Sequence, residues 1–296
     1  VVRAFKPDLI CTGTSSGVTV EKQLWRIGKT LGISTAAVID FWINYQLRFC
    51  FNDTGRITER DLPDWIMVMD DLAKREMVAE GFPSRRIIIT GNPHFEAFKR
   101  FPAPSARAAR TITFVDQHIS ELLKRGVHER LGFDEREVFA DLLRALTELR
   151  LDAKVLLEFH PGSQDRTRYD QYSASSPVRV EKLPDTETLH RAFNRSELVV
   201  GMTSMALFEA ALGGKVVLSY QPHPLRKVDP LISNRLGLSH FAYRYADFKR
   251  KLARLMARRT PVDVHRRLVE RYTKSGATNR IITVITSLCE ERTPKP

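Results

Sequence analysis

Residues 198–210 read Leu-Val-Val-Gly-Met-Thr-Ser-Met-Ala-Leu-Phe-Glu-Ala and carry the most informative pattern in the chain. The apolar run 198–200 is typical of a buried strand, and a short polar stretch separates it from a helix-forming run. This order predicts that backbone N–H groups and the hydroxyls of Thr203 and Ser204 meet at a helix N-terminus, where anions bind readily. Glu209 follows in the first turns, where a carboxylate can accept hydrogen bonds from a ribose diol. The alternative is that Thr203 or Ser204 only caps the helix.

Short β-branched runs alternate with amphipathic helical stretches along the rest of the chain, which is typical of parallel α/β structure. The expected strands are 9–11, 34–39, 65–69, 86–90, 111–115, 154–159, 178–181, 198–200 and 216–220. The expected helices are 20–31, 71–80, 134–149, 186–193, 204–212 and most of 262–290. This pattern predicts two Rossmann-like domains that face each other.

The domain boundaries follow from a Pro-rich stretch in the middle of the chain. We expect a Rossmann-like first domain over residues 1–100, a linker over 101–110, and a second domain with C-terminal helices over 111–290. The first domain shows only four recognisable strands, and the chain opens a few residues before the first of them. We therefore expect a piece of the first domain, with its own strand and loop, to be missing from the chain.

Polar residues at strand ends are the candidate ligand contacts, because ligands of parallel α/β sheets bind where strands end and helices begin. They are Ser15, Asp40, Asn92, Asp116, His160, Gly201, Thr203 and Ser204. His160 follows a strand and precedes a proline, so it can donate to a phosphate; the alternative is a solvated loop histidine. Asp40 can be a base or orient one, whereas the aromatic residues after it can stack on a sugar or lie in the core.

The composition excludes several classes of protein. The chain has 296 residues, of which 43% are hydrophobic and 28% charged, as in soluble globular proteins. It has no apolar run near the roughly 18–20 residues of a membrane-spanning helix. Its three cysteines are scattered, which excludes a disulfide framework and favours a cytoplasmic protein. We find no Walker loop, no GxGxxG and no metal-ligand spacing, so we expect no tightly bound cofactor and no metal site.

The positive charge has three readings. Lys and Arg number 47 against 35 Asp and Glu, a formal net charge of +12. It can be a solvated surface, or it can attract anionic lipid through the basic amphipathic helix expected near residues 248–259, with the protein peripheral at the inner face of the membrane. Nucleic acid is not expected, because no zinc finger, RNA-recognition motif or helix-turn-helix accompanies the charge.

The order of these motifs resembles the non-hydrolysing UDP-GlcNAc 2-epimerases, which share the GT-B fold with many glycosyltransferases. The first half of the resemblance is carried by the residues 7–15, 33–40, 62–70 and 86–93. The second half is carried by His160-Pro161 and by the stretch from Thr203-Ser204 to Glu209. His-Pro and Ser/Thr-Ser motifs also recur in bacterial sialyltransferases of this fold, and the His-Pro in CDP-glycerol polymerases.

The resemblance implies a site for a nucleotide sugar, linked to UDP or to CMP or CDP. It implies that Thr203 and Ser204 hold the diphosphate, that Glu209 holds the ribose, and that His160 is a phosphate-contacting or catalytic histidine. Asp40 replaces the glutamate of the corresponding strand end. The sequence departs from the epimerases at residues 13–15, where Gly-Thr-Ser replaces Gly-Asp-Thr and an acidic group is lost.

Because epimerisation needs acid and base groups around the sugar, these departures favour transfer. We therefore expect a glycosyltransferase that moves a sugar to a surface-polysaccharide, glycoconjugate or lipid-linked acceptor, with Asp40 as base and His160 at the phosphates. A sugar-nucleotide 2-epimerase or hydrolase on the same fold is the first alternative. A binding protein for nucleotide sugars that has no catalytic activity is the second.

Overall fold

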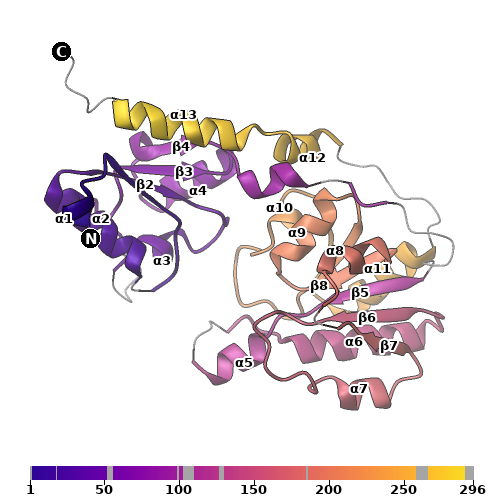
Figure 1. The fold of residues 1–296 in the computed structure, drawn as a ribbon. Helices are drawn as coiled ribbons and strands as arrows, with labels where there is room; N and C mark the ends of the chain where they lie inside the picture. The colour runs from indigo at the N-terminus through magenta and orange to yellow at the C-terminus, as the bar shows by residue number, and fades with distance from the viewer. Residues whose placement is uncertain are drawn as a thin grey trace. The chain divides into compact units, whose positions relative to one another are not determined.

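The computed structural model describes residues 2–17, 19–51, 56–98, 100–102, 110–126, 130–184, 186–257 and 266–290. These residues form two units of parallel α/β structure (Figure 1). The first unit comprises residues 1–97 and 270–296, and the second comprises residues 98–269. The predicted α/β class with two parallel sheets is confirmed.

The first unit is built on a four-stranded parallel sheet in the order β1-β2-β3-β4. Its strands are β1 (Leu9–Thr12), β2 (Ser34–Val38), β3 (Trp65–Val68) and β4 (Ile87–Ile89). Its helices are α1 (Val2–Phe5), α2 (Val20–Leu31), α3 (Tyr45–Phe49), α4 (Asp71–Ala79) and α13 (Ala277–Glu290), with 3-10 turns η1 (Ser84–Arg86) and η2 (Pro93–Ala97). Helix α12 (Arg266–Thr273) spans the boundary between the units.

Helix α2 illustrates how local sequence sets the boundaries of an element. It ends at Gly32, which takes the left-handed conformation (φ 67°) and whose N–H donates to the last helical carbonyls. Glycine adopts this conformation without the steric cost that a Cβ brings, so Gly32 ends the helix and redirects the chain into β2. The predicted helix at 20–31 and its glycine cap are confirmed.

The C-terminal helix belongs to the first unit, not to the second domain as expected from the sequence. The apolar face of α13 packs on the sheet of the first unit, where Leu288 lies against Ala36 and Met67. Its N-terminus is held by Glu96 of η2, whose carboxylate accepts hydrogen bonds from the backbone and hydroxyl of Thr278 at 3.1 and 2.6 Å. The sequence pattern shows that this helix is amphipathic, but the choice of sheet depends on tertiary contacts.

The second unit is built on a six-stranded parallel sheet in the order β10-β9-β8-β5-β6-β7. Its strands are β5 (Thr111–Val115), β6 (Lys154–Glu158), β7 (Arg179–Lys182), β8 (Leu198–Gly201), β9 (Val216–Tyr220) and β10 (His240–Ala242). Its helices are α5 (Ile119–Lys124), α6 (Glu135–Glu148), α7 (Asp170–Ala174), α8 (Leu189–Asn194), α9 (Met205–Leu212), α10 (Ile232–Arg235) and α11 (Tyr245–Ala257). Strand β10 and the short helices α3, α5, α7 and α10 were not expected from the sequence.

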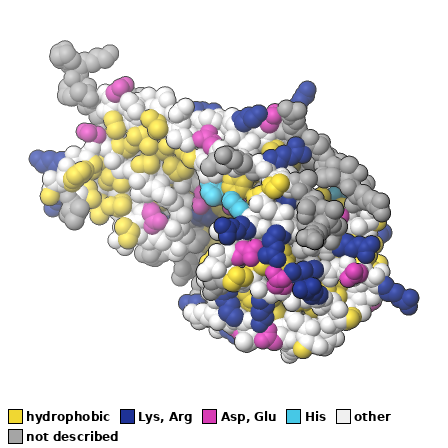
Figure 2. Space-filling view, turned by 45° about the vertical axis from the view of Figure 1, so that its right-hand side comes forward, with side chains coloured by type: hydrophobic (Ala, Val, Ile, Leu, Met, Phe, Trp, Pro, Cys, Tyr) yellow, Lys and Arg dark blue, Asp and Glu magenta, His cyan; other side chains and the backbone are white. Residues whose placement is uncertain are grey.

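Helix α11 lies within the basic stretch for which lipid contact was considered. Its apolar side chains, among them Phe248 and Leu252, are buried in the core of the second unit. Its cations pair with acids: Lys249 with Glu148, and Lys251 with an aspartate one turn before it. Over the second unit in Figure 2, Lys and Arg side chains are interspersed with Asp and Glu. These contacts favour the solvated-surface reading of the charge. Among the described residues, no helix is long and apolar enough to cross a membrane.

The start of the expected linker is anchored on the second unit. The backbone N–H of Phe101 donates to the carbonyl of Gly213 at 2.8 Å, and Lys215 Nζ donates to the carbonyl of Pro102 at 3.0 Å. The ring of Phe101 also meets Phe193 edge-on, with 5.5 Å between centroids. Residues 103–109 lie outside the described residues. Phe101 and Pro102 are therefore held on the second unit.

We expect Gly213→Ala to destabilise the second unit. A Cβ built on Gly213 would lie 2.1 Å from Cδ2 of the Phe101 ring, so the ring must move. Overpacking of this kind costs about 1–3 kcal/mol, measurable by urea unfolding. Gly13→Ala is the matched control, because nothing lies within 4 Å of its Cβ. Equal midpoints for both variants would contradict the close contact.

Candidate functional site

The sheet of the second unit has a topological switch point between β5 and β8. The chain passes from β5 to β6 and β7 on one side, and then to β8, β9 and β10 on the other. Loops from neighbouring strands diverge at such a point and leave a crevice at the carboxyl ends of the strands, where ligands bind. The residues that follow β5, β6 and β8 therefore define the candidate site.

The loops after β5 and β8 are joined by one side chain that sequence reasoning missed. Gln117 Oε1 accepts the backbone N–H of Thr203 at 2.7 Å, and Gln117 Nε2 donates to Thr203 Oγ1 at 3.0 Å. Ser204 is the N-cap of α9, and its Oγ accepts the N–H of Ala206 at 3.3 Å. The capping role considered for Ser204 is thus present. Its hydroxyl hydrogen can still donate, so capping and anion binding are compatible.

Gly201 closes β8 and is buried beneath the site. A Cβ at this position would lie 3.1 Å from the carbonyl oxygen of Val115 on β5 and 3.1 Å from the side chain of Leu207. The absence of a side chain therefore lets β8 and α9 approach β5 closely. Gly201 shapes the site through packing. Because Gly201 is buried, the residues after it are the ones placed to contact a ligand.

Two histidines meet at the ends of β5 and β6. The rings of His118 and His160 lie with their centroids 4.2 Å apart and their planes at 34°. His160 Nδ1 accepts the backbone N–H of Gly162 at 3.0 Å, which leaves the proton of a neutral ring on Nε2. Burial lowers the pKa of His160, and the adjacent His118 lowers it further. At neutral pH, His160 is thus a neutral imidazole that donates through Nε2–H.

This environment predicts a loss of stability in acid. Since the folded-state pKa of His160 lies below its ordinary value of 6.5, the unfolded chain binds the proton more tightly. Stability is therefore full above pH 6.5 and falls as the pH drops through the folded-state pKa. We expect His160→Gln to flatten the pH dependence of the unfolding free energy below pH 6.5. An unchanged slope in that variant would contradict the neutral state.

Asp116, expected as a ligand contact, lies below the surface of the site. It is 1% exposed. Its carboxylate accepts the backbone N–H of His160 at 3.1 Å and hydrogen bonds from Arg168 Nη2 and the Tyr169 hydroxyl. These partners occupy both oxygens, so Asp116 is not placed to bind a ligand directly.

Glu209 lies on α9 beside residues that sequence reasoning did not identify. Its Oε2 is 3.9 Å from Nε2 of His190, which stands at the start of α8. The His190 ring also meets Phe98 and Phe101 edge-on, with 5.3 and 5.4 Å between centroids. Glu209 on α9 therefore faces His190 on α8, near the anchored start of the linker.

The candidate residues of the first unit lie at the ends of its own strands. Ser15 Oγ donates to Glu21 at 2.9 Å. Asp40 has a side chain that is 71% exposed and pairs with Arg48 Nη1 at 3.0 Å. The same Arg48 nitrogen donates to the carbonyl of Thr14 at 3.1 Å, so it joins the loops after β1 and β2. Sequence reasoning missed Arg48, which lies in the unexpected helix α3.

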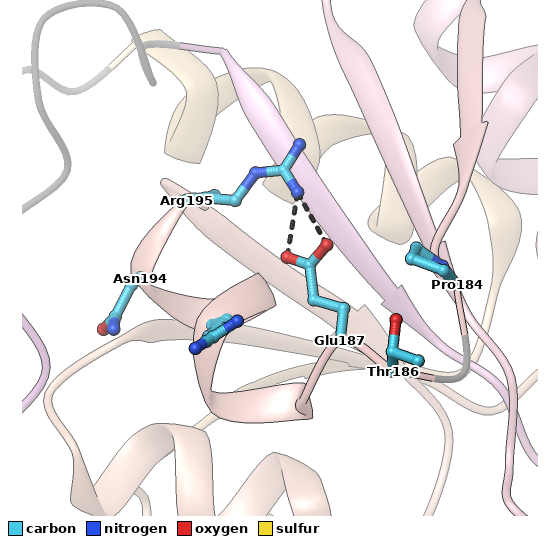
Figure 3. A pocket seen from close by; sticks show the side chains of 6 residues that line it. Pro184, Thr186, Glu187, Asn194 and Arg195 are labelled. Atoms are coloured by element: carbon cyan, nitrogen blue, oxygen red, sulfur yellow. Dashed lines mark hydrogen bonds and ion pairs between the residues drawn. The ribbon is translucent and has the colours of Figure 1, made fainter.

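Asn92 lines a cavity of about 290 Å³ in the first unit, together with Asp70 and Arg280. Its Oδ1 accepts the backbone N–H of His94 at 3.0 Å. A shallower surface pocket lies on α8 of the second unit, where Arg195 donates to both carboxylate oxygens of Glu187 at 2.8 and 3.0 Å (Figure 3). The histidines and hydroxyls at the switch point do not line that pocket. Among the described residues, no group of three His, Cys, Asp or Glu could hold a metal ion.

Comparisons with known proteins identify the family and the fold. The chain matches the family model for UDP-N-acetylglucosamine 2-epimerase over residues 50–286. The UDP-GlcNAc 2-epimerase of Methanocaldococcus jannaschii shares 12% identity with a TM-score of 0.62, over 97% of this chain and 79% of that chain. The enzyme of Neisseria meningitidis, solved with UDP-GlcNAc, shares 14% with a TM-score of 0.58, over 96% and 78%. Comparison with curated sequences gives no match.

A glycosyltransferase has the same fold. The lipopolysaccharide outer core galactosyltransferase WaaB shares 13% identity with a TM-score of 0.58, over 97% of this chain and 77% of that chain. The two parallel sheets therefore define a GT-B-type protein, the class that includes nucleotide-sugar epimerases and glycosyltransferases. Since the family model covers most of the chain, it belongs to the UDP-N-acetylglucosamine 2-epimerase family. This assignment favours the epimerase or hydrolase alternative over the transferase expected first.

Proposed function

We propose that this chain binds a UDP sugar of the UDP-N-acetylglucosamine class at the switch point of the second unit and acts on it as a 2-epimerase or hydrolase. The observation that carries the proposal is the convergence of hydrogen-bond donors at the ends of β5, β6 and β8. They are the His118 and His160 imidazoles, the Gln117 amide, and the hydroxyls of Thr203 and Ser204. The family to which the chain belongs supports the choice of substrate class.

The donors suit a leaving diphosphate. When the bond between the sugar C1 and the diphosphate oxygen breaks, its electron pair remains on that oxygen and the negative charge there grows. Nε2–H of His160, the hydroxyl of Ser204 and the N-terminus of α9 would stabilise the charge without reorganising. The carboxylate of Asp116 would otherwise repel it, but Arg168 neutralises that carboxylate.

Glu209 would bind the ribose. A carboxylate accepts two hydrogen bonds from neighbouring hydroxyls, and its position one turn into α9 leaves the helix N-terminus to the phosphates. For epimerisation a base must also remove the proton from C2 of the sugar as the C1–oxygen bond breaks, which leaves a C1–C2 double bond. A proton must then return to the opposite face of C2 while the diphosphate oxygen adds back to C1. We propose Asp40 as the base, because it is an exposed carboxylate whose orientation is fixed by Arg48.

Sugar transfer is the second candidate, and the departure at residues 13–15 favours it. Epimerisation needs a group that gives a proton as well as one that takes it, whereas transfer needs one base to activate an acceptor hydroxyl. Thr14 stands where the related enzymes have an acid, and its hydroxyl accepts a hydrogen bond from Arg48 Nη1 at 3.0 Å. The acceptor would be a glycan or a lipid-linked sugar.

The test is to incubate the protein with UDP-GlcNAc alone and follow the products by NMR. We expect the 2-epimer, or free sugar and UDP, to form without an acceptor. His160→Gln should abolish the reaction, whereas His94→Gln, at an exposed histidine of the first unit, should not. Asp40→Asn should bind UDP normally but turn over slowly. Consumption of UDP-GlcNAc only after a glycan acceptor is added would favour transfer, and UDP binding with no turnover would favour a binding protein.

A further inference from the structure

We propose that the buried ion pair of Arg168 with Asp116 is a positioning device for His160, which fixes the loop after β6 so that the imidazole is stacked on His118 and donates through Nε2. This inference rests on the proposed function only in taking His160 as a donor to the diphosphate. Arg168 belongs to no motif that the sequence identified, and it touches none of the hydroxyls at the switch point.

The hydrogen bonds around Asp116 connect β5 directly to both ends of this loop. One oxygen of Asp116 accepts from the backbone N–H of His160, at the start of the loop, at 3.1 Å. The same oxygen accepts from Arg168 Nη2, at the end of the loop. The other oxygen accepts from the hydroxyl of Tyr169. A single carboxylate therefore sets the distance between the two ends and holds the backbone of His160.

The other side of the guanidinium fixes the middle of the loop. Arg168 Nη1 donates to Glu121 Oε1 at 2.6 Å and to the carbonyl of Asp165 at 2.6 Å. Glu121, on α5, also accepts the backbone N–H of Gln164 at 3.0 Å and the hydroxyl of Ser163 at 2.9 Å. The loop after His160 is thus tied to α5 through Ser163, Gln164 and Arg168, and Arg168 also ties it to the end of β5.

The burial of this cluster argues for a role beyond stability. The Arg168 side chain is 3% exposed, and its Nε has no hydrogen-bond partner although Glu135 Oε1 lies 3.6 Å away. A buried ion pair contributes little net stability compared with apolar residues of the same size, because both charges lose their hydration. The arrangement does, however, give one fixed geometry, and the group that it fixes is the backbone of His160.

The cluster also sets the charge around the His160 ring. After burial and the adjacent His118, the groups that act on its pKa are Asp116 and Glu121, which raise it, and Arg168, which lowers it. Loss of Arg168 would thus leave both carboxylates uncompensated beside the ring. We expect the pKa of His160 to rise in Arg168→Met.

The test measures His160 by NMR in the full chain and turnover of UDP-GlcNAc as a function of pH. In Arg168→Met we expect the His160 titration to move to higher pH, and kcat to fall between about 10-fold and 100-fold with KM changed much less. Arg168→Lys should recover part of kcat, because lysine restores the positive charge but not the paired N–H donors of the guanidinium. Unchanged titration and kcat in Arg168→Met would overturn the proposal.

A milder pair of variants decides the question if Arg168→Met does not fold. Tyr169→Phe removes one hydrogen bond to Asp116, whereas Tyr220→Phe removes a tyrosine–aspartate hydrogen bond to Asp141 at 2.7 Å, outside the site and partly buried. We expect both to lose similar stability, but only Tyr169→Phe to speed hydrogen exchange at the His160 amide, by about tenfold or more. Equal exchange rates would overturn the proposal. If the wild-type protein does not turn over UDP-GlcNAc, the proposed function is contradicted. The histidine titration and the hydrogen-exchange rates would still test the positioning role of Arg168.

Discussion

Asp116→Ala is expected to lower the free energy of unfolding of the second unit by about 3–5 kcal/mol, the cost of breaking a buried ion pair. The substitution leaves three donors without their acceptor: the guanidinium of Arg168, the hydroxyl of Tyr169 and the backbone N–H of His160. Each is buried or at the edge of the site, so water replaces the lost hydrogen bonds poorly. Urea unfolding followed by far-UV circular dichroism measures the change.

The chain offers internal and external controls for this prediction. All three tryptophans, Trp25, Trp42 and Trp65, lie in the first unit, so their fluorescence reports on that unit alone. We expect this fluorescence transition to stay unchanged in Asp116→Ala. Asp170→Ala removes a surface ion pair with Lys182 and should cost less than about 1 kcal/mol. If Asp116→Ala cost as little, the buried network would not have the geometry described.

Removal of helix α13 is expected to unfold the first unit. Truncation after Ser275 removes Ile281, Val284, Ile285 and Leu288 from the sheet and exposes its apolar face. The lost burial is worth on the order of 5 kcal/mol, comparable with the whole stability of a small domain. The Trp fluorescence of the truncated chain should resemble that of the unfolded chain.

The control for the truncation is a chain that ends at Glu290 and therefore keeps α13. It should retain the native fluorescence. UDP binding by the second unit, measured by calorimetry, should survive in both chains if the proposed nucleotide site lies wholly in that unit. Native fluorescence in the chain cut after Ser275 would show that α13 does not complete the first unit.

Much of the fold could be predicted because its signals are local. The β-branched runs from 111–115 and 216–220 match β5 and β9 residue for residue, and Gly32 ends α2 as its position indicates. Strand β10 was missed because its three residues, His240 to Ala242, carry no periodicity and are strand-like only through pairing with β9. The short helices were missed for the same reason, since one or two turns hold too few residues to show a 3.6-residue repeat.

The candidate site was predicted in its parts but not in its connections. His160, Thr203 and Ser204 follow strands, so the sequence marks them as strand-end residues. Gln117, which bonds Thr203, and Arg168, which shares the Asp116 carboxylate with His160, follow no motif. Only the parallel pairing of β5 with both β6 and β8 brings these residues together.

The alternation of strands and helices, the strand-end positions of the polar residues and the resemblance to a family can all be read along the chain, because each depends on neighbouring residues. Three features follow only from tertiary contacts: the unit to which α13 belongs, the burial of Asp116 and its pairing with Arg168. These depend on residues far apart in sequence, 52 positions in the case of Asp116 and Arg168. Burial converts that distant contact into a strong constraint, since a charge removed from water must find its partner inside the protein.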